Sequence, residues 1–184
     1  MARVQGMTSG GAPVKTISKE YELCFRCHAD RGSRSTSKVA RQFSQPNTRL
    51  QFNPGNASYH PVLGAAKSTQ DRTLLSSWTV SQQMLCTDCH NNDQGPRVNG
   101  TGPNGPHGSR YDHLLVARYE TRDFTAETSQ SYALCYRCHD RTSILSDQSF
   151  RSKTLATTAS GGGHRGHLAA GAPCSACHDP HGVS

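Results

Sequence analysis

Residues 164–182 read HRGHLAAGAPCSACHDPHG, and the CSACH segment at 174–178 has two cysteines three positions apart, followed by a histidine. The same CXXCH pattern occurs three more times, as CFRCH at 24–28, CTDCH at 86–90 and CYRCH at 135–139. The four motifs use all 8 cysteines of the chain. We therefore expect the fold to depend on what these motifs bind.

In a CXXCH motif, two thiols one helical turn apart can form thioether bonds with the two vinyl groups of a haem, and the histidine can ligate its iron. Zinc knuckles, redox-active disulfides and structural disulfides are the alternatives. Zinc knuckles do not require a histidine after every pair. With 10 histidines in 184 residues, four out of four by chance has a probability of about one in a hundred thousand. The sequence therefore predicts four covalently bound c-type haems.

Each motif supplies two attachment residues and one proximal iron ligand. The predicted attachment residues are Cys24, Cys27, Cys86, Cys89, Cys135, Cys138, Cys174 and Cys177. The predicted proximal ligands are His28, His90, His139 and His178.

The composition agrees with a cofactor-rich interior. Only 33% of the 184 residues are hydrophobic, and the mean hydropathy is −0.68, so a core of side chains alone would be thin. Four porphyrins in contact would supply the missing apolar surface. The predicted fold class is a multihaem cytochrome c, with mostly irregular loops and a few short helices wrapped around four closely packed haems, and little β-sheet.

Two stretches resemble each other, YELCFRCHADRGS from Tyr21 and YALCYRCHDRTS from Tyr132. This similarity indicates a single tetrahaem domain, 1–184, built from a duplicated dihaem unit at about 18–118 and 128–184.

Helices are expected near 18–29, 81–91 and 128–140, each beginning at a Ser or Thr and carrying the cysteine pair in its last turn. The polar stretches 31–58 and 151–163 are expected to be loops.

Six histidines lie outside the motifs, and four haems need at most four of them as distal ligands. The repeat supplies four symmetrically, His60 and His167 before the second motif of each half, and His107 and His181 in Pro-His-Gly after it. His164, three residues before His167, is a fifth candidate, whereas His113 has no counterpart and is expected to be exposed or bonded to a propionate.

Methionine is the competing sixth ligand in cytochromes. The chain has three, Met1, Met7 and Met84, and Met84 lies only two residues before Cys86. We therefore predict bis-histidine ligation and low reduction potentials, because the axial ligand is a principal determinant of the potential.

The net charge of +7 does not indicate nucleic-acid binding, because no basic stripe is interleaved with aromatic residues. Eight propionates would add about −8 and four ferric centres about +4, so the basic residues are expected mostly to offset the cofactors. No apolar run approaches the length of a membrane span, the longest being tetrads such as LLVA at 114–117. No signal peptide precedes Tyr21, so the numbering is expected to start at the mature end.

The sequence resembles the multihaem cytochromes with doubled CXXCH motifs. The resemblance rests on YELCFRCH, HPV, GPHGS followed by LL, YALCYRCHD, and HxxHL before CSACHDPHGVS. More closely, it resembles filament-forming extracellular cytochrome nanowires of the OmcE type. The HxxH before a CXXCH is also found in cytochromes of the c3 type, where the two histidines serve different haems.

The resemblance implies an electron carrier, not an enzyme, in an extracellular or cell-surface location after export. Its partners would be other copies in a head-to-tail filament, with an axial histidine crossing to a neighbour, together with redox proteins or extracellular electron acceptors. A monomeric periplasmic shuttle is the first alternative. A multihaem reductase with one open haem is the second.

Overall fold

The structure is a computed structural model that describes residues 4–30, 45–67, 73–149 and 163–183. The chain divides into two compact units. Unit 1 comprises residues 1–67, 81–86 and 178–184, and unit 2 comprises residues 68–80 and 87–177. The C-terminal residues thus belong to the same unit as the N-terminal third, so the units do not follow the two halves suggested by the repeat. The duplication at 18–118 and 128–184 stays a prediction.

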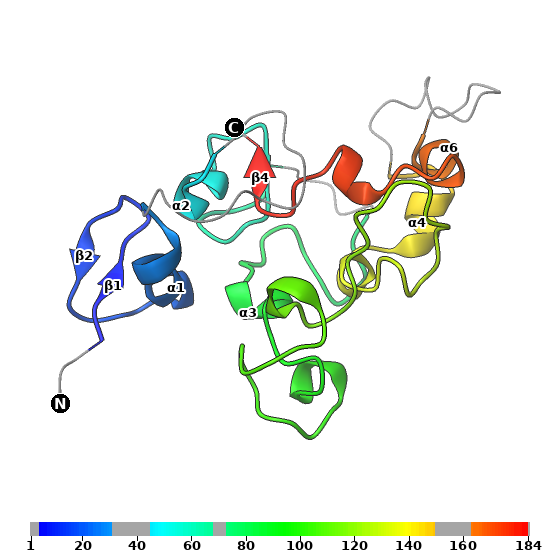
Figure 1. The fold of residues 1–184 in the computed structure, drawn as a ribbon. Coiled ribbons are helices and arrows are strands. Elements are labelled where there is room, and N and C mark those ends of the chain that lie inside the picture. The colour runs from blue at the N-terminus through cyan, green and yellow to red at the C-terminus, as the bar shows by residue number, and fades with distance from the viewer. Residues whose placement is uncertain (1–3, 31–44, 68–72, 150–162, 184) are drawn as a thin grey trace. The chain divides into compact units, whose positions relative to one another are not determined.

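Unit 1 begins with an antiparallel hairpin of β1 (Gly6–Met7) and β2 (Pro13–Val14), and β1 packs against helix α1 (Glu20–His28) (Figure 1). The backbone N–H groups of Ser18 and Lys19 donate to Oε2 of Glu22, at 2.7 and 3.0 Å. These two bonds lower the pKa of Glu22 and close the first turn of the helix. Phe25, buried on the same helix, is 1% exposed.

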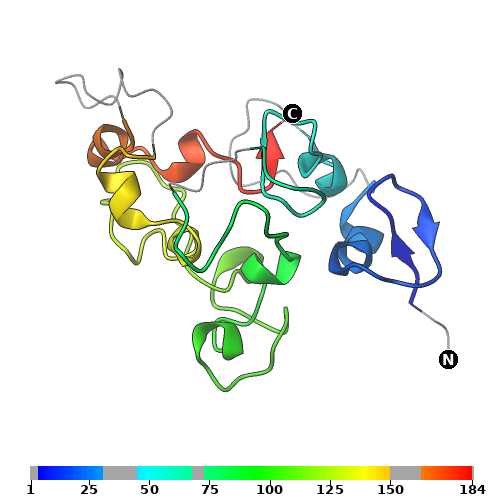
Figure 2. The same ribbon diagram turned by 180° about the vertical axis from the view of Figure 1, so that it is seen from behind.

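The second part of unit 1 joins distant segments of the chain. Strand β3 (Ser58–Tyr59) pairs antiparallel with β4 (Gly182–Val183), with Ser58 opposite Val183 and Tyr59 opposite Gly182. Helix α2 (Thr48–Gln51) precedes β3, and both Figure 1 and its rear view, Figure 2, show β4 beside α2. The C-terminal segment is therefore held next to residues 48–60.

The described elements of unit 2 are short helices. They include the 3₁₀ helices η1 (Pro96–Val98), η2 (Asp112–Leu114), η3 (Cys135–Arg137) and η4 (Cys174–Ala176), and the α-helices α4 (Arg141–Leu145) and α6 (His164–Ala169). Helix α3 (Cys86–Cys89) leads into this unit. Helices α4 and α6 pack against each other, and the described core of the unit is formed by Val116, Tyr132, Leu134 and Leu168.

The helix predicted near 18–29 is confirmed as α1, although it is preceded by Lys19 and not by a Ser or Thr cap. The helices predicted near 81–91 and 128–140 are wrong in extent, because only the four residues of α3 and the three of η3 are helical around the cysteines. Tertiary hydrogen bonds explain the difference. The N–H of Met84 donates to Pro61 and that of Leu134 donates to Arg118, so these backbones are bonded to other segments.

The predicted loops can be checked only in part. Helix α2 lies inside the range 31–58, whose residues 31–44 lie outside the described residues. Of the range 151–163, only Gly163 is described. Short helices, two two-stranded sheets and much irregular backbone make up the described chain, and the packing of haems within it stays a prediction.

Gly182 should be sensitive to substitution. Its φ is +136°, and a Cβ there would overlap the carbonyl oxygens of Gln51 and Ser58. We expect Gly182→Ala to lower the free energy of unfolding by about 2 kcal/mol, through backbone strain and overpacking at the β3–β4 pair. Denaturant unfolding of the haem-loaded protein, followed by circular dichroism, measures the effect. Gly108→Ala is the control, because a Cβ at Gly108 has no atom within 4 Å, and an equal loss in both variants would contradict the assignment.

Candidate functional site

Each CXXCH motif lies on a single helical turn. The cysteine pairs fall in α1, in α3, and at the start and the C-cap of both η3 and η4. All eight cysteines are free thiols, and Cys27 and Cys177 are exposed while the others are half-buried. Two thiols on one turn can reach the two vinyl groups on the same side of a porphyrin, as the spacing predicted. The donor set therefore fits covalently bound haem.

Numbered in chain order, CFRCH is motif 1, CTDCH motif 2, CYRCH motif 3 and CSACH motif 4. The first cysteines of motifs 1 and 2 lie together in unit 1. The Sγ atoms of Cys24 and Cys86 and a carboxylate oxygen of Glu20 are all within 4.8 Å of one another. A hydrogen bond from Cys86 lowers the pKa of Cys24, and the same bond raises the pKa of Cys86. Among the described residues this is the cluster that could hold a metal ion. It has three potential ligands where a structural zinc site takes four.

Unit 2 contains two further contacts between motifs. The thiol of Cys135 is hydrogen-bonded to Cys174, which lowers the pKa of Cys174 and raises that of Cys135. Burial, followed by the charge of the nearby Cys138 thiol, raises the pKa of Cys89 to about 12. Cysteines of motif 3 therefore lie next to cysteines of both motif 2 and motif 4.

Two histidines donate from Nδ1 to a backbone carbonyl. His90, a predicted proximal ligand, donates to the carbonyl of His113 at 2.8 Å. His60, a predicted distal ligand, donates to the carbonyl of Pro180. Because a carbonyl can only accept, Nδ1 must carry the proton in both rings, and coordination to iron would be through Nε2. A bond of this kind orients a metal-binding imidazole and increases its basicity.

Two more distal candidates have Nδ1 contacts to side chains. Nδ1 of His181 lies 2.7 Å from Oε1 of Gln51, and the His181 ring packs on Phe52 with centroids 4.8 Å apart. Nδ1 of His164 lies 3.1 Å from the hydroxyl of Ser149. The sequence indicated both histidines but not these neighbours.

The remaining predicted ligands differ in their solvent exposure and in their contacts. His28 ends α1 and is exposed, whereas the backbone of His139 forms a bridge with Leu74. His107 and His167 are exposed. His178 is exposed as a residue, yet the protein atoms around its ring lower its pKa, and the charge of His60 lowers it further. The structure therefore brings His60 and His178 together within unit 1.

Some residues that support the site were not predicted. His113 has an exposed side chain, as expected, but its carbonyl accepts from His90, and both His113 and Leu114 have positive φ, at 61° and 55°. Neither is a glycine, so no sequence signal marked this turn.

Asn91, directly after motif 2, is 0% exposed. Its side chain donates to the carbonyl of Thr87 and to Asn104, and it accepts from the N–H groups of Asn92 and Gly105. This amide connects motif 2 to the following loop, which the sequence indicated only as a turn-rich insertion.

Arginines are paired with the protein's own carboxylates. Among the described residues, ion pairs engage Arg49, Arg97, Arg110, Arg118, Arg122, Arg141 and Arg165. Two pairs involve groups at the motifs. Arg97 binds Asp88 of the CTDCH motif, and Glu127 binds Arg141 and the hydroxyl of Tyr136 in CYRCH. The net charge of +7 already counts these carboxylates, so the expectation that the basic residues mostly offset the cofactors stays a prediction.

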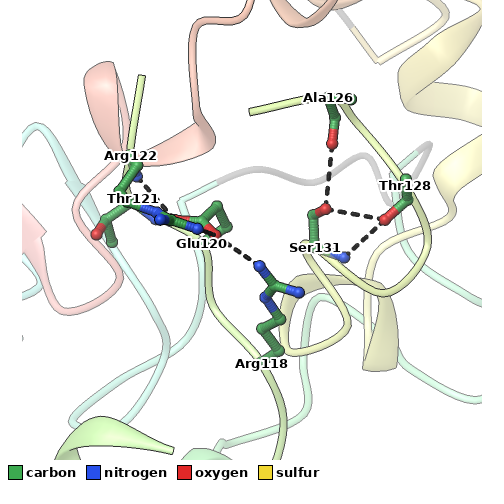
Figure 3. A network of polar contacts seen from close by, with 7 residues as sticks. All are labelled: Arg118, Glu120, Thr121, Arg122, Ala126, Thr128 and Ser131. Atoms are coloured by element: carbon green, nitrogen blue, oxygen red, sulfur yellow. Dashed lines mark hydrogen bonds and ion pairs between the residues drawn. The ribbon is translucent and has the colours of Figure 1, made fainter. Parts of the chain in front are cut away.

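Figure 3 shows the most connected of these pairs. Glu120 is 6% exposed and accepts from Arg118 at 2.8 Å, from Nε of Arg122 at 3.1 Å and from the N–H groups of Thr121 and Arg122. The side-chain bond from Arg122, followed by that from Arg118, lowers the pKa of Glu120 to about 2. The N–H of Glu120 in turn donates to the carbonyl of Ser131. This network positions the segment that leads into motif 3.

The turns of the four motifs carry free thiol pairs, and two imidazoles are oriented from Nδ1, which are the features expected of a cytochrome with covalently attached haem. The family model described as "Outer membrane cytochrome MtrC/MtrF-like, domains II/IV" matches residues 12–184. The chain belongs to this family of multihaem electron-transfer cytochromes, whose members bind haem c. No curated protein and no solved structure matches it significantly. The family indicates a location at the cell surface or outside the cell, and no helix in the described parts of the chain has the length and apolarity of a membrane span.

Acid should weaken the Glu120 network. Its pKa of about 2, against a usual value of 4.5, means that the ionised carboxylate stabilises the folded chain above about pH 4.5, and that this stabilisation is lost as the pH falls through 2. We expect Glu120→Gln to lower the melting temperature of the haem-loaded protein at pH 7, and the difference from wild type to narrow between pH 4.5 and 2. Thermal melts across this range measure it. The control is Asp123→Asn, at an exposed neighbour, and a difference independent of pH would contradict the prediction.

Proposed function

We propose that the protein carries electrons through a chain of four covalently bound, low-potential, bis-histidine c-type haems. The observation that carries this proposal is the contact between thiols of successive motifs. Cys24 meets Cys86, Cys89 lies near Cys138, and Cys135 meets Cys174. Thiol hydrogen bonds therefore link motif 1 to 2 and motif 3 to 4, and Cys138 of motif 3 lies close enough to motif 2 to affect the pKa of Cys89.

Each cysteine would hold a porphyrin at its edge through a thioether bond. Adjacent thiols therefore bring the edges of successive haems close together, and electron transfer is fastest across short gaps between edges. Haem supplies the redox chemistry as iron cycles between the ferric and ferrous states. The polypeptide attaches the haems, orients their ligands and surrounds them with fixed charges. No chemical substrate is required.

Histidine ligation of all four irons is supported by the supply of imidazoles and by their hydrogen bonds. His60, His107, His164, His167 and His181 are candidates for four distal positions. Carbonyl acceptors at Nδ1 make an imidazole a stronger donor to ferric iron, which favours low potentials. The thioether of Met84, by contrast, belongs to a residue that is 9% exposed, and its backbone N–H is bonded to Pro61.

We further propose that copies of the chain join head to tail into an extracellular conductive filament. Support comes from the resemblance to OmcE-type nanowires and from the supply of histidines, two of which, His107 and His167, are exposed. A heterologous, non-closing interface produces an open polymer. A histidine that binds iron in the next copy would set the spacing of the haems across the interface. Extracellular acceptors or redox proteins would receive the electrons.

The haem content can be tested by motif removal. We expect four haems per chain by intact mass and by the haemochrome spectrum, and three in a Cys174→Ala/Cys177→Ala variant, because thioether bonds hold each haem. Met84→Leu is the matched control and should leave both the count and the reduction potentials unchanged. A wild-type count below four, or a shift of one potential in Met84→Leu, would contradict the proposal.

The assembly can be tested by imaging. We expect electron microscopy of the haem-loaded protein to show filaments, and the reduced protein to bind no carbon monoxide, because every iron has six ligands. A strictly monomeric, fully loaded protein would support the periplasmic shuttle in place of the filament. Stoichiometric carbon monoxide binding at one haem would support a reductase with an open iron.

A further inference from the structure

We infer that His60 is the distal ligand of the iron whose proximal ligand is His178. This pairing rests on the proposed haem-binding function and deepens it. It joins residues 118 positions apart in the sequence, and it assigns a histidine of the first half of the chain to the last motif. The sequence repeat indicated only that His60 is a distal-ligand candidate that precedes motif 2, not which iron it binds.

The pairing of β3 with β4 is the first observation. In its antiparallel register Tyr59 lies opposite Gly182, and the residues adjoining this pair are His60 on one segment and His181 on the other. Nδ1 of His60 then donates to the carbonyl of Pro180, two residues after His178. The ring of His60 is therefore tied to the segment that directly follows motif 4.

The orientation of His60 is the second observation. The Pro180 carbonyl sets the proton on Nδ1 and directs coordination through Nε2. The backbone on the C-terminal side of His60 is also fixed, because Val62 donates to the carbonyl of His60 at 2.7 Å and Met84 donates to that of Pro61 at 3.0 Å. Val62 itself is 4% exposed. A ligand held at its ring and at its backbone is pre-organised for a metal.

The third observation is that His60 and His178 belong to the same compact unit, in which Pro180, the acceptor for His60, lies only two residues after His178. Two imidazoles that bind one iron from opposite faces of a porphyrin must be neighbours in the folded chain.

His181 is the nearest alternative and is less suitable. It follows His178 by three residues, which span at most about 10 Å when fully extended. A ligand on the opposite face requires a path around the edge of the porphyrin, which is longer. The ring of His181 instead contacts Phe52 and Oε1 of Gln51. His181 is therefore directed to helix α2, and His60 to the segment after motif 4.

The test uses the full-length, haem-loaded protein and electron paramagnetic resonance. In wild type we expect four low-spin haems. In His60→Ala, one of the four should become high-spin, and added imidazole should restore the low-spin signal. His60→Met should keep that haem low-spin with one methionine ligand and a raised potential, which also reports on the pairing if the alanine variant folds poorly. Ser58→Ala is the control, because Ser58 lies two residues before His60, is exposed and pairs with Val183 through its backbone.

A second variant identifies the iron. When the motif 4 haem is removed by Cys174→Ala/Cys177→Ala, the addition of His60→Ala should create no new high-spin signal. A new high-spin haem in this combination would assign His60 to another iron and overturn the pairing. Four low-spin haems in His60→Ala alone would also overturn it, while leaving the electron-transfer proposal intact. Fewer than four haems, or a high-spin haem in wild type, would refute the proposed function and the pairing with it.

Discussion

A CXXCH motif can take a haem only if one helical turn presents both thiols and is followed directly by the imidazole. Much of the described structure stabilises such turns. In motif 1, a nine-residue helix, α1, meets this requirement with its own hydrogen bonds and a buried Phe25. The other three turns are too short to be stable alone. Around motif 2, bonds to distant backbone hold the turn, because Val116 donates to the carbonyl of Cys89 and Asn91 donates to that of Leu114.

Backbone hydrogen bonds also orient two of the imidazoles. His90 and His60 are both oriented by backbone carbonyls, which cannot be lost by substitution of a side chain. The carbonyl of His113 is available because two successive residues adopt positive φ. A backbone acceptor sets the tautomer of the ligand and its basicity together. If these imidazoles bind iron as proposed, chain geometry would thereby affect its reduction potential.

Carboxylates near the motifs are paired with arginines. Asp88 and Glu127 lie within or beside two motifs, and each is neutralised by an arginine. Glu120 is neutralised by two, and its depressed pKa reflects both. Buried carboxylates near a haem would otherwise stabilise its ferric state. Pairing them with arginine limits this effect and at the same time fixes the loops between the motifs.

The sequence by itself determined where haem could be attached, because CXXCH is a local pattern whose function depends on spacing along one turn. It also indicated α1, the scarcity of regular structure and the set of candidate histidines. The other two predicted helices were too long because tertiary hydrogen bonds to Pro61 and Arg118 compete with the helical pattern. Only the tertiary structure decided which groups meet. The contacts of Cys24 with Cys86 and of His60 with Pro180 depend on segments far apart in the chain. No local periodicity encodes such contacts, and that of His60 with Pro180 accompanies the pairing of β3 with β4 and the close approach of Gly182 to Gln51.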